Sequence, residues 1–314
     1  MDKTKFMVYV SCMTYNQSSY IKDALDSFCM QQTDFPFVCG VIDDASTDGE
    51  PNVLLEYLKE HFDINDESWT KRDETQDYVR IFARHKSNSN CYFVVVLLKY
   101  NHRQIKKTKI PYTAEWRNTA KYIAINEGDD YWIDPMKLQK QVDFMESHPE
   151  HSLCFCAHKT KNPEGKEEVI RRYATNIDCC PMGDIIFGGG GFMATNSMLY
   201  RQSLYVPHTT WSAGCPIGDA PIMLSLAAKG NVGYLADVMC VYRIMAKGSW
   251  TTRMNNSFSD RRKHHKSIIR MWHQFDEWSE RKYHKIVMKK LRYNKKEFLK
   301  DVIITKFNNI FNLK

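Results

Sequence analysis

The chain has 314 residues, of which 43% are hydrophobic and 26% are charged, a composition typical of a globular protein with one large domain or two. It has neither an apolar run of about 18 residues nor a signal-peptide pattern at its start, so we expect no membrane-spanning helix, no secretion and a cytoplasmic location. The net charge of +7 is uneven. Residues 261–314 hold 16 of the 44 basic and 5 of the 37 acidic residues, or +11, and the remainder holds 28 against 32, or −4.

The cysteines do not indicate a metal or disulfide framework. There are ten, and most lie in apolar segments, where a free thiol behaves as a small hydrophobic group. None forms a Cys-x-x-Cys pair, so a structural zinc site is not expected. Disulfides would also be unusual in a cytoplasmic chain of this length.

The N-terminal half alternates short apolar runs with helical patterns, which favours a mostly parallel sheet. Residues 63–90 are polar and lack a clear period, so we expect a loop or an insertion there. Residues 99–112 form a basic linker that is either a solvated loop or a segment leaning over a diphosphate. The expected strands are residues 6–12, 37–42, 92–98, 122–125 and 152–158, and the expected helices are 21–28, 53–62, 113–121 and one that begins at Asp134-Pro135.

Three of these expected strands end in polar side chains. Ligands of open α/β sheets bind at the C-terminal edge of the strands, so three such ends fit one shared pocket better than three unrelated turns. The polar ends are Met13-Thr14-Tyr15-Asn16, then Asp43-Asp44-Ala45-Ser46-Thr47-Asp48-Gly49, then Glu127-Gly128-Asp129-Asp130.

The third polar end holds three crowded carboxylates, those of Glu127, Asp129 and Asp130. Carboxylates this close repel one another unless a cation lies among them, and hard oxygen ligands suit Mg²⁺ or Mn²⁺, which often share a substrate's phosphates. The turn therefore suggests a site for a metal-bound phosphate ester. The alternative is a solvated acidic turn that caps the following helix.

The middle of the chain is less regular. Gly188-Gly189-Gly190-Gly191 does not match the dinucleotide-binding fingerprint, because Met193 stands at the third glycine position and no clear helix follows. We expect these glycines to form a tight turn, or to let the backbone approach a sugar, before a strand at 194–200. Asp219 then opens a helical pattern that ends at Gly230, and its carboxylate is either a helix cap or a functional group. Another strand is expected at 238–244.

From about residue 255 the pattern is helical and basic. The apolar positions form two stripes, which are typical either of helices that pack on the core or of a basic amphipathic segment on an anionic membrane surface. The first stripe comprises Ile268, Ile269, Trp272, Phe275 and Trp278 and continues through Val287, Leu291 and Phe298, and the second comprises Ile303, Ile304, Phe307, Ile310 and Phe311.

The three polar strand ends resemble the three signatures of glycosyltransferase family 2. The matching segments are Val10 to Asn16, Ile42 to Gly49 and Glu127 to Asp130, which follow the family's order and spacing within residues 1–150. The acidic segment departs from the family's usual Asp-x-Asp, because Glu127 takes the first place. Glutamate also offers oxygen ligands, so metal binding is retained in principle.

The resemblance implies a GT-A fold, which is a Rossmann-like α/β fold with a mostly parallel central sheet flanked by helices, followed here by a helical C-terminal extension. It implies a nucleotide-diphosphate sugar as donor and a divalent metal, Mn²⁺ or Mg²⁺. By the same resemblance Thr14 and Tyr15 flank the base, and Asp43 or Asp44 bonds the base or the ribose. The implied nucleotide-sugar residues are Thr14, Tyr15, Asn16, Asp43, Asp44, Glu127, Gly128, Asp129 and Arg243, with Asp129 and Glu127 as metal ligands.

The resemblance also implies a catalytic role for Asp219. In the family a carboxylate at a helix start faces the acceptor and acts as general base, and Ile217-Gly218-Asp219-Ala220-Pro221 is similar to that segment. Tyr242-Arg243 with Gly248-Ser249-Trp250 is similar to the family's segment that closes over the diphosphate. The family often has a histidine where this chain has Met245, which leaves Arg243 or Lys247 for the phosphate contact.

The expected organisation is a glycosyltransferase domain at 1–254, with a donor half at 1–135 and an acceptor half at 136–254, and an extension at 255–314. The expected function is inverting transfer of a sugar, from a UDP-sugar in the first instance, to a glycan or lipid-linked glycan in cell-surface polysaccharide synthesis. The chain lacks Gln-x-x-Arg-Trp, so addition of a single sugar is favoured over polymerisation.

Three alternatives belong to other functional classes. A nucleotide-sugar pyrophosphorylase is disfavoured, because Met13-Thr14-Tyr15-Asn16 contains neither the glycine nor the base of a phosphate loop. A non-catalytic partner that binds nucleotide sugar in an assembly complex remains open. Nucleic-acid binding is not expected, because the basic and aromatic residues of the tail fall on opposite faces of a helix. The expected partners are therefore the donor, the acceptor and a peripheral membrane surface.

Overall fold

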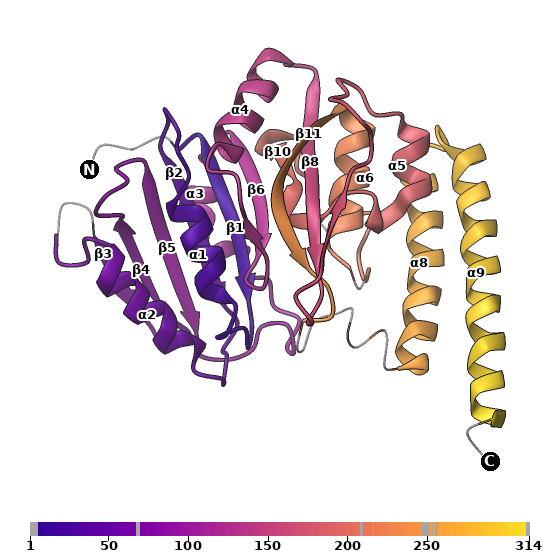
Figure 1. Ribbon diagram of the computed structural model, residues 1–314, viewed down its shortest axis with the longest axis horizontal. Helices are drawn as coiled ribbons and strands as arrows, with labels where there is room; N and C mark the ends of the chain where they lie inside the picture. Colours follow the sequence, from indigo (N-terminus) through magenta and orange to yellow (C-terminus); the bar gives the residue numbers. More distant parts are fainter. Residues whose placement is uncertain are drawn as a thin grey trace.

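Within residues 6–66, 70–207, 210–215, 217–246, 252, 254 and 257–311, which the computed structural model describes, eleven strands form one mixed sheet (Figure 1). Their order is β3-β4-β5-β2-β1-β6-β10-β8-β11-β7, and β9 pairs with β8. The strands are β1 (Val8–Thr14), β2 (Phe37–Asp43), β3 (Lys71–Glu74), β4 (Tyr78–Arg84), β5 (Cys91–Leu98), β6 (Tyr122–Glu127), β7 (Tyr131–Trp132), β8 (His151–Lys161), β9 (Glu167–Ile170), β10 (Leu199–Arg201) and β11 (Asn231–Arg243).

The central part of the sheet is parallel, as expected. β5, β2, β1 and β6 run in the same direction, and their continuous apolar runs are buried on both faces, as parallel strands require. Antiparallel strands extend this centre on both sides: β4 and β3 beyond β5, and β10 beyond β6. The polar ends of β1, β2 and β6 therefore lie at one edge of the sheet, the lower edge in Figure 1.

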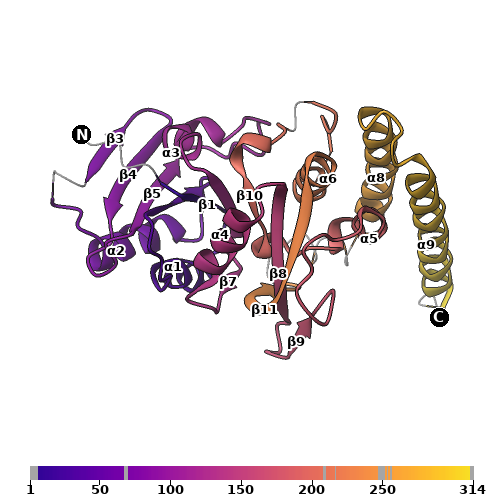
Figure 2. The same ribbon diagram turned by 90° about the horizontal axis from the view of Figure 1, so that it is seen from above.

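Helices cover both faces of the sheet (Figure 2). One apolar cluster joins α1, α2 and α4 to side chains such as Val10 and Val41, and the other joins α3, α5, α6 and α8 to side chains such as Tyr9 and Val94. The alternation of side chains along each strand supplies both faces. The helices are α1 (Ile21–Cys29), α2 (Glu50–His61), α3 (Ala114–Arg117), α4 (Lys137–Ser147), α5 (Met182–Gly188), α6 (Asp219–Lys229), α8 (Phe258–Trp278) and α9 (His284–Phe311).

Three expectations about local structure were wrong. Of the loop or insertion expected at 63–90, the loop is wrong, because β3 and β4 form a hairpin within this range in which Arg80 pairs with Asp73. The helix expected at 113–121 is a single turn, α3, preceded by a 3-10 turn at Ile110–Thr113. The strand expected at 194–200 begins only at Leu199, since a 3-10 turn occupies Thr195–Ser197.

The first apolar stripe of the C-terminal region packs on the core. Met271, Trp272, Phe275, Val287 and Leu291 are all buried in the same cluster as α6. α9 is the outermost helix in Figure 1 and packs on α8 and α5. Among the described residues, no helix is both long enough and apolar enough to cross a membrane.

Replacement of Trp272 by alanine tests whether α8 belongs to the cooperative core. Its side chain is 1% exposed, so its removal should lower the free energy of unfolding by about 3–5 kcal/mol. Leu299→Ala, at a side chain that is 61% exposed, is the matched control and should change the free energy by less than about 0.5 kcal/mol. Urea denaturation followed by circular dichroism measures both, and equal stability of the two variants would contradict the assignment.

Candidate active site

The acidic turn after β6 packs directly against the end of β1. The Gly128 N–H donates to the carbonyl of Met13 at 3.1 Å. A Cβ atom at Gly128 would lie 2.5 Å from both Thr14 Oγ1 and Gln17 Oε1, so only glycine fits this approach. The first and third signature segments are therefore in contact, as one shared pocket requires.

Asp130 links the end of β6 to the end of β11. Its side chain is 1% exposed, and Oδ1 accepts the backbone N–H of Arg243 at 2.8 Å, while Oδ2 has no hydrogen-bond partner. Burial, with Asp129 nearby, raises the pKa of Asp130 well above its usual range. This residue holds two strand ends together at the centre of the acidic cluster.

The guanidinium of Arg243 bonds to groups around the acidic turn. Nη1 donates to the carbonyl of Asp129 at 2.6 Å, Nη2 pairs with Asp23, and the group stacks over the Tyr131 ring at 4.5 Å. Arg243 would have to give up some of these partners to reach a phosphate. The other expected phosphate contact, Lys247, and the segment Gly248-Ser249-Trp250 lie outside the described residues.

Asp219 approaches the acidic turn from a different part of the chain. It is half-buried and is the first residue of α6, whereas the cap position itself belongs to Gly218. Its Oδ1 accepts the N–H of Ala220 at 2.8 Å. Asp219 is close enough to Glu127 to raise the pKa of that carboxyl. The predicted base therefore lies within electrostatic range of Glu127, one of the two predicted metal ligands.

The pKa of Glu127 shows the effect of the crowded carboxylates. Solvent reaches its side chain, although protein atoms surround it. Desolvation, followed by the charges of Asp129 and Asp219, raises the pKa of Glu127 to about 7, and Arg103 and Lys109 oppose the rise. The cations present offset the negative charge only partly, so an added cation would be stabilised here.

The residues present fit a divalent cation that a ligand helps to hold. Among the described residues, no three His, Cys, Asp or Glu side chains are arranged to hold a metal ion by themselves. Glu127 and Asp129 offer carboxylate oxygens, which suits Mg²⁺ or Mn²⁺ when phosphates and water complete the coordination. Desolvation raises the pKa of Asp129 as well, so a cation would favour its charged form.

A buried glutamate, Glu50, connects the first two signature segments. It is 0% exposed and accepts hydrogen bonds from Thr14 Oγ1, from the Gln17 N–H at 2.9 Å and from Ser46 Oγ at 2.9 Å. Sequence reasoning missed this residue. The available signal was an acid at the first helical position, directly after Gly49, whose φ of 91° is left-handed, and before a proline.

The residues predicted to bind the base differ in whether their side chains are exposed or already hydrogen-bonded. Tyr15 is 41% exposed, whereas Thr14 is buried with its hydroxyl bonded to Glu50. Asn16 Oδ1 accepts the Thr47 N–H at 2.8 Å and so joins the two loops. Asp43 Oδ2 accepts the Ser46 N–H at 3.1 Å, but Asp43 Oδ1 is buried without a hydrogen-bond partner.

Asp44, by contrast, is fully engaged by the segment that follows β5. Its Oδ1 accepts the His102 N–H at 2.7 Å, and its Oδ2 accepts the Arg103 N–H at 3.2 Å and the Lys109 ammonium at 2.7 Å. Of the two aspartates that the sequence left as alternatives, Asp43 therefore retains the acceptor for a base or ribose.

Tyr242 is a further residue that the sequence did not single out for the site. Its half-buried phenol lies within electrostatic range of Asp130, Glu127, Asp129 and Asp219, and burial together with these charges raises its pKa. A neutral hydroxyl among four carboxylates is a hydrogen-bond donor in an otherwise acidic environment.

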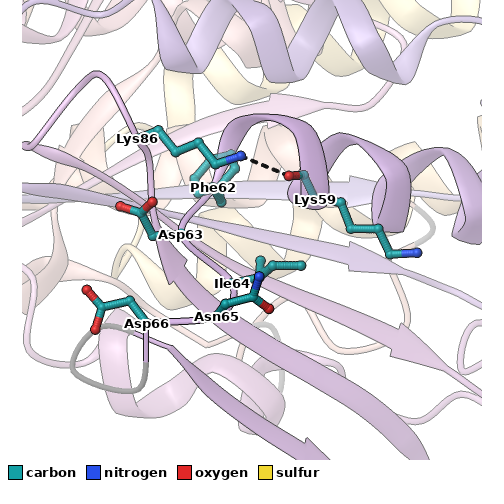
Figure 3. Close-up of a pocket in the computed structure, with 7 residues that line it drawn as sticks. All are labelled: Lys59, Phe62, Asp63, Ile64, Asn65, Asp66 and Lys86. Atoms are coloured by element: carbon teal, nitrogen blue, oxygen red, sulfur yellow. Dashed lines mark hydrogen bonds between the residues drawn. The ribbon is translucent and has the colours of Figure 1, made fainter.

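A cavity of about 620 Å³ lies elsewhere, where α2 ends (Figure 3). There the Lys86 ammonium donates to the carbonyls of Lys59 at 3.0 Å and Glu60 at 2.7 Å, which caps the helix. α2 begins near the edge of the sheet at which β2 ends, so the end of α2 lies toward the opposite edge. None of the predicted site residues lines this cavity, whose walls are Lys59, Phe62, Asp63, Ile64, Asn65, Asp66 and Lys86.

Comparison with known proteins agrees with the resemblance seen in the sequence. Residues 10–88 match the family model of glycosyl transferase family 2. Uncharacterised proteins of Mycobacterium bovis and Mycobacterium tuberculosis are 29% identical over 264 residues, which cover 80% of this chain and 61% of theirs. The chain thus spans about three fifths of the length of these relatives.

Solved structures share the fold. TarS 1–349 of S. aureus in complex with UDP-GlcNAc matches with a TM-score of 0.54 and 17% identity over 85% of this chain and 66% of that one. The same protein with UDP matches with a TM-score of 0.52 and 14% identity over 91% and 88%. The expected GT-A fold is confirmed, and so is the family resemblance over residues 10–88.

Proposed function

We propose that this chain, which carries the glycosyl transferase family 2 match, is an inverting glycosyltransferase that moves one sugar from a nucleotide-diphosphate sugar to a glycan hydroxyl. The observation that carries the proposal is the packing of the Glu127–Asp129 turn against the end of β1, where Gly128 contacts Thr14 and Gln17. Asp219, 92 positions beyond Glu127, lies within electrostatic range of it, so one edge of the sheet would supply a general base and the ligands for a metal-bound diphosphate.

The donor we propose is a UDP-sugar. The exposed ring of Tyr15 is available to stack on a base, and Asp43 Oδ1 is an acceptor that lacks a partner. The imide N–H of uracil is a donor of the matching kind. The solved TarS structures with the same fold hold UDP and UDP-GlcNAc, which supports testing uracil nucleotides first.

A divalent metal, Mn²⁺ or Mg²⁺, held by Asp129 and Glu127, would offset the charge that develops on the leaving diphosphate. The protein's own residues perform the remaining tasks. Asp219 accepts the proton of the acceptor hydroxyl as its oxygen bonds to the anomeric carbon. The bond between that carbon and the diphosphate breaks at the same time, and the nucleoside diphosphate leaves with the electron pair, so the configuration is inverted.

In this scheme residues 1–135 hold the donor, residues 136–254 face the acceptor, and residues 255–314 extend the domain. The acceptor we propose is a glycan or lipid-linked glycan of the cell surface, added to at the cytoplasmic side. α9 supports contact with an anionic membrane, because Leu299, Ile303 and Ile304 are exposed, at 61%, 55% and 58%, and exposed Lys295 and Lys296 lie about one turn before Leu299.

The second candidate function is a non-catalytic partner that binds nucleotide sugar within an assembly complex. It needs the same donor pocket but not the base. The closeness of Asp219 to Glu127 favours the enzyme, since a pure binding protein gains nothing from an extra carboxylate beside an anionic ligand.

The donor pocket is tested by thermal unfolding with UDP, GDP, CDP and TDP, each with and without Mn²⁺. A nucleotide at about 100 times its dissociation constant stabilises the fold by about 2.7 kcal/mol. We expect a shift with UDP that depends on Mn²⁺ in the wild type and is lost in Asp129→Asn, whose own unfolding temperature should stay near that of the wild type. Absence of any shift with all four nucleotides would contradict the proposed function.

Replacement of Asp219 by asparagine distinguishes the two candidate functions, an enzyme and a non-catalytic binding protein. The amide cannot accept the proton, so turnover should fall by about 10²–10⁴-fold while the Kd for UDP with Mn²⁺ stays within about twofold. Transfer from UDP-GlcNAc and from UDP-glucose, followed as UDP release with a glycan acceptor mixture, is the measurement. Unchanged turnover would show that Asp219 is only the first residue of a helix.

Membrane contact is measured by co-sedimentation with vesicles of phosphatidylglycerol and phosphatidylcholine. The exposed apolar face should bind anionic vesicles and not purely zwitterionic ones. Ile303→Asp with Leu299→Asp should weaken binding at least about tenfold, since each charge opposes insertion. Val169→Asp, at an exposed apolar side chain on β9, is the control. Binding that survives in the double variant would reject this surface.

A further inference from the structure

The basic segment 99–112 is fixed on the sheet by one buried carboxylate. Asp44 is 1% exposed, and its two oxygens accept the N–H groups of His102 and Arg103 and the ammonium of Lys109. The carbonyl of Asp44 also accepts the Asn101 side-chain amide at 3.0 Å. The sequence left open whether this segment is a solvated loop or leans over a diphosphate. Four of its hydrogen-bond donors bond to Asp44 at the end of β2, so it is not a freely solvated loop.

Aromatic contacts make the segment more rigid. His102 is fully buried, stacks on Tyr100 with ring centroids 4.9 Å apart, and bonds through Nε2 to the Tyr112 hydroxyl at 2.8 Å. Tyr112 in turn bonds through its carbonyl to Arg80 on β4 at 3.0 Å. Both ends of the segment are thus tied to the sheet, which limits the movement of the residues between them.

The hydrogen bonds of Asp44 bring Arg103 toward the acidic turn. The backbone N–H of Arg103 donates to Asp44, and the N–H of Asp44 donates at 3.0 Å to the carbonyl of Thr14, against which Gly128 packs. The Arg103 side chain is exposed, whereas the ammonium of Lys109 is already 2.7 Å from Asp44. Among the described residues, no hydrogen bond or ion pair holds the Arg103 guanidinium.

We propose that Arg103 binds the donor's diphosphate and that Asp44 is the positioning residue that holds Arg103 there, an inference that rests on the proposed function. A guanidinium binds phosphate oxygens through two parallel hydrogen bonds, and it gains most where its backbone is already ordered. Arg103 then holds the anion from the side of β2 and β5, across the site from Arg243 on β11.

The test is titration calorimetry with a nucleoside diphosphate and its nucleoside. UDP and uridine are titrated with Mn²⁺ into the wild type, Arg103→Ala and Lys106→Ala, which removes the same charge from an exposed side chain of the same segment. Arg103→Ala should raise the Kd for UDP at least about tenfold and leave the Kd for uridine within twofold. Lys106→Ala should leave both within about twofold.

Asp44→Asn tests the positioning role. The amide keeps one acceptor but loses the charge that holds Lys109 and the two N–H groups, so the Kd for UDP should rise while trypsin cleavage after Arg103 and Lys106 becomes faster. Adding Arg103→Ala to Asp44→Asn should then weaken UDP binding further by much less than tenfold, because the two residues act through one contact.

Several results would overturn this inference. An unchanged Kd for UDP in Arg103→Ala would refute the phosphate contact, and equal losses for UDP and uridine would show a general structural effect. An equal loss of UDP affinity in Lys106→Ala would show that the effect comes from net charge and not from a specific contact of Arg103. A wild type that binds UDP while Arg103→Ala is unaffected refutes only this inference, whereas a wild type that binds none of UDP, GDP, CDP and TDP refutes the proposed function with it.

Discussion

Repulsion among carboxylates at the C-terminal edge of the sheet is the constraint around which the site is built. Glu127, Asp129 and Asp130 follow one strand, and Asp219 joins them from α6. The protein satisfies only part of this charge. One oxygen of Asp130 accepts a backbone N–H, and the other has no partner, while the pKa of the solvent-reached Glu127 is raised to about 7. Such an arrangement is costly for a purely structural turn, and a cation would stabilise it by offsetting the negative charge.

Two other buried carboxylates have a structural role that makes this edge rigid. Glu50 accepts donors from the loops after β1 and β2, and Asp44 accepts donors from the segment after β5. The hydrogen bonds from several N–H or O–H donors offset the free-energy cost of burying each carboxylate. Loops supply such donors because their backbone N–H groups are not used in a helix or sheet. The loops that follow the neighbouring strands β1, β2 and β5 are therefore tied into one surface, and Arg103 and Tyr15 lie on it in a backbone that is already ordered.

The rest of the fold supports that edge through two apolar faces. β1, β2 and β5 are buried on both sides, so the helices on each side fix their direction and register. α8 and the first half of α9 complete one of these faces with Trp272, Phe275 and Leu291. The exposed Ile303 and Ile304 lie beyond that contact, so α9 changes along its length from a core helix to a helix that exposes these two apolar side chains.

Local patterns along the chain were enough for much of the fold and for part of the site. Long apolar runs such as 37–42 and 92–98 identified the central strands. A strand that is buried on both faces is apolar at every position, so it stands out in the sequence as a continuous apolar run. The hairpin β3–β4 was missed because its stability comes from cross-strand pairs such as Arg80 with Asp73, which are invisible in a polar segment read alone. α3 was predicted too long, since its helical pattern competes with the turn that brings Thr113 to Tyr9.

The sequence by itself determined which strands end in polar residues, that three carboxylates crowd after β6, and that the first half resembles glycosyltransferase family 2. Only the tertiary structure decided which of those residues meet. It placed Asp219 within electrostatic range of Glu127, bonded Asp44 to the basic segment, left Asp43 Oδ1 without a hydrogen-bond partner, and placed Glu50 and Tyr242 among the predicted site residues. The physical reason is that a side chain's type and period are local properties, whereas its hydrogen-bond partners and the charges around it depend on contacts between distant segments, which exist only once the two faces of the sheet are packed.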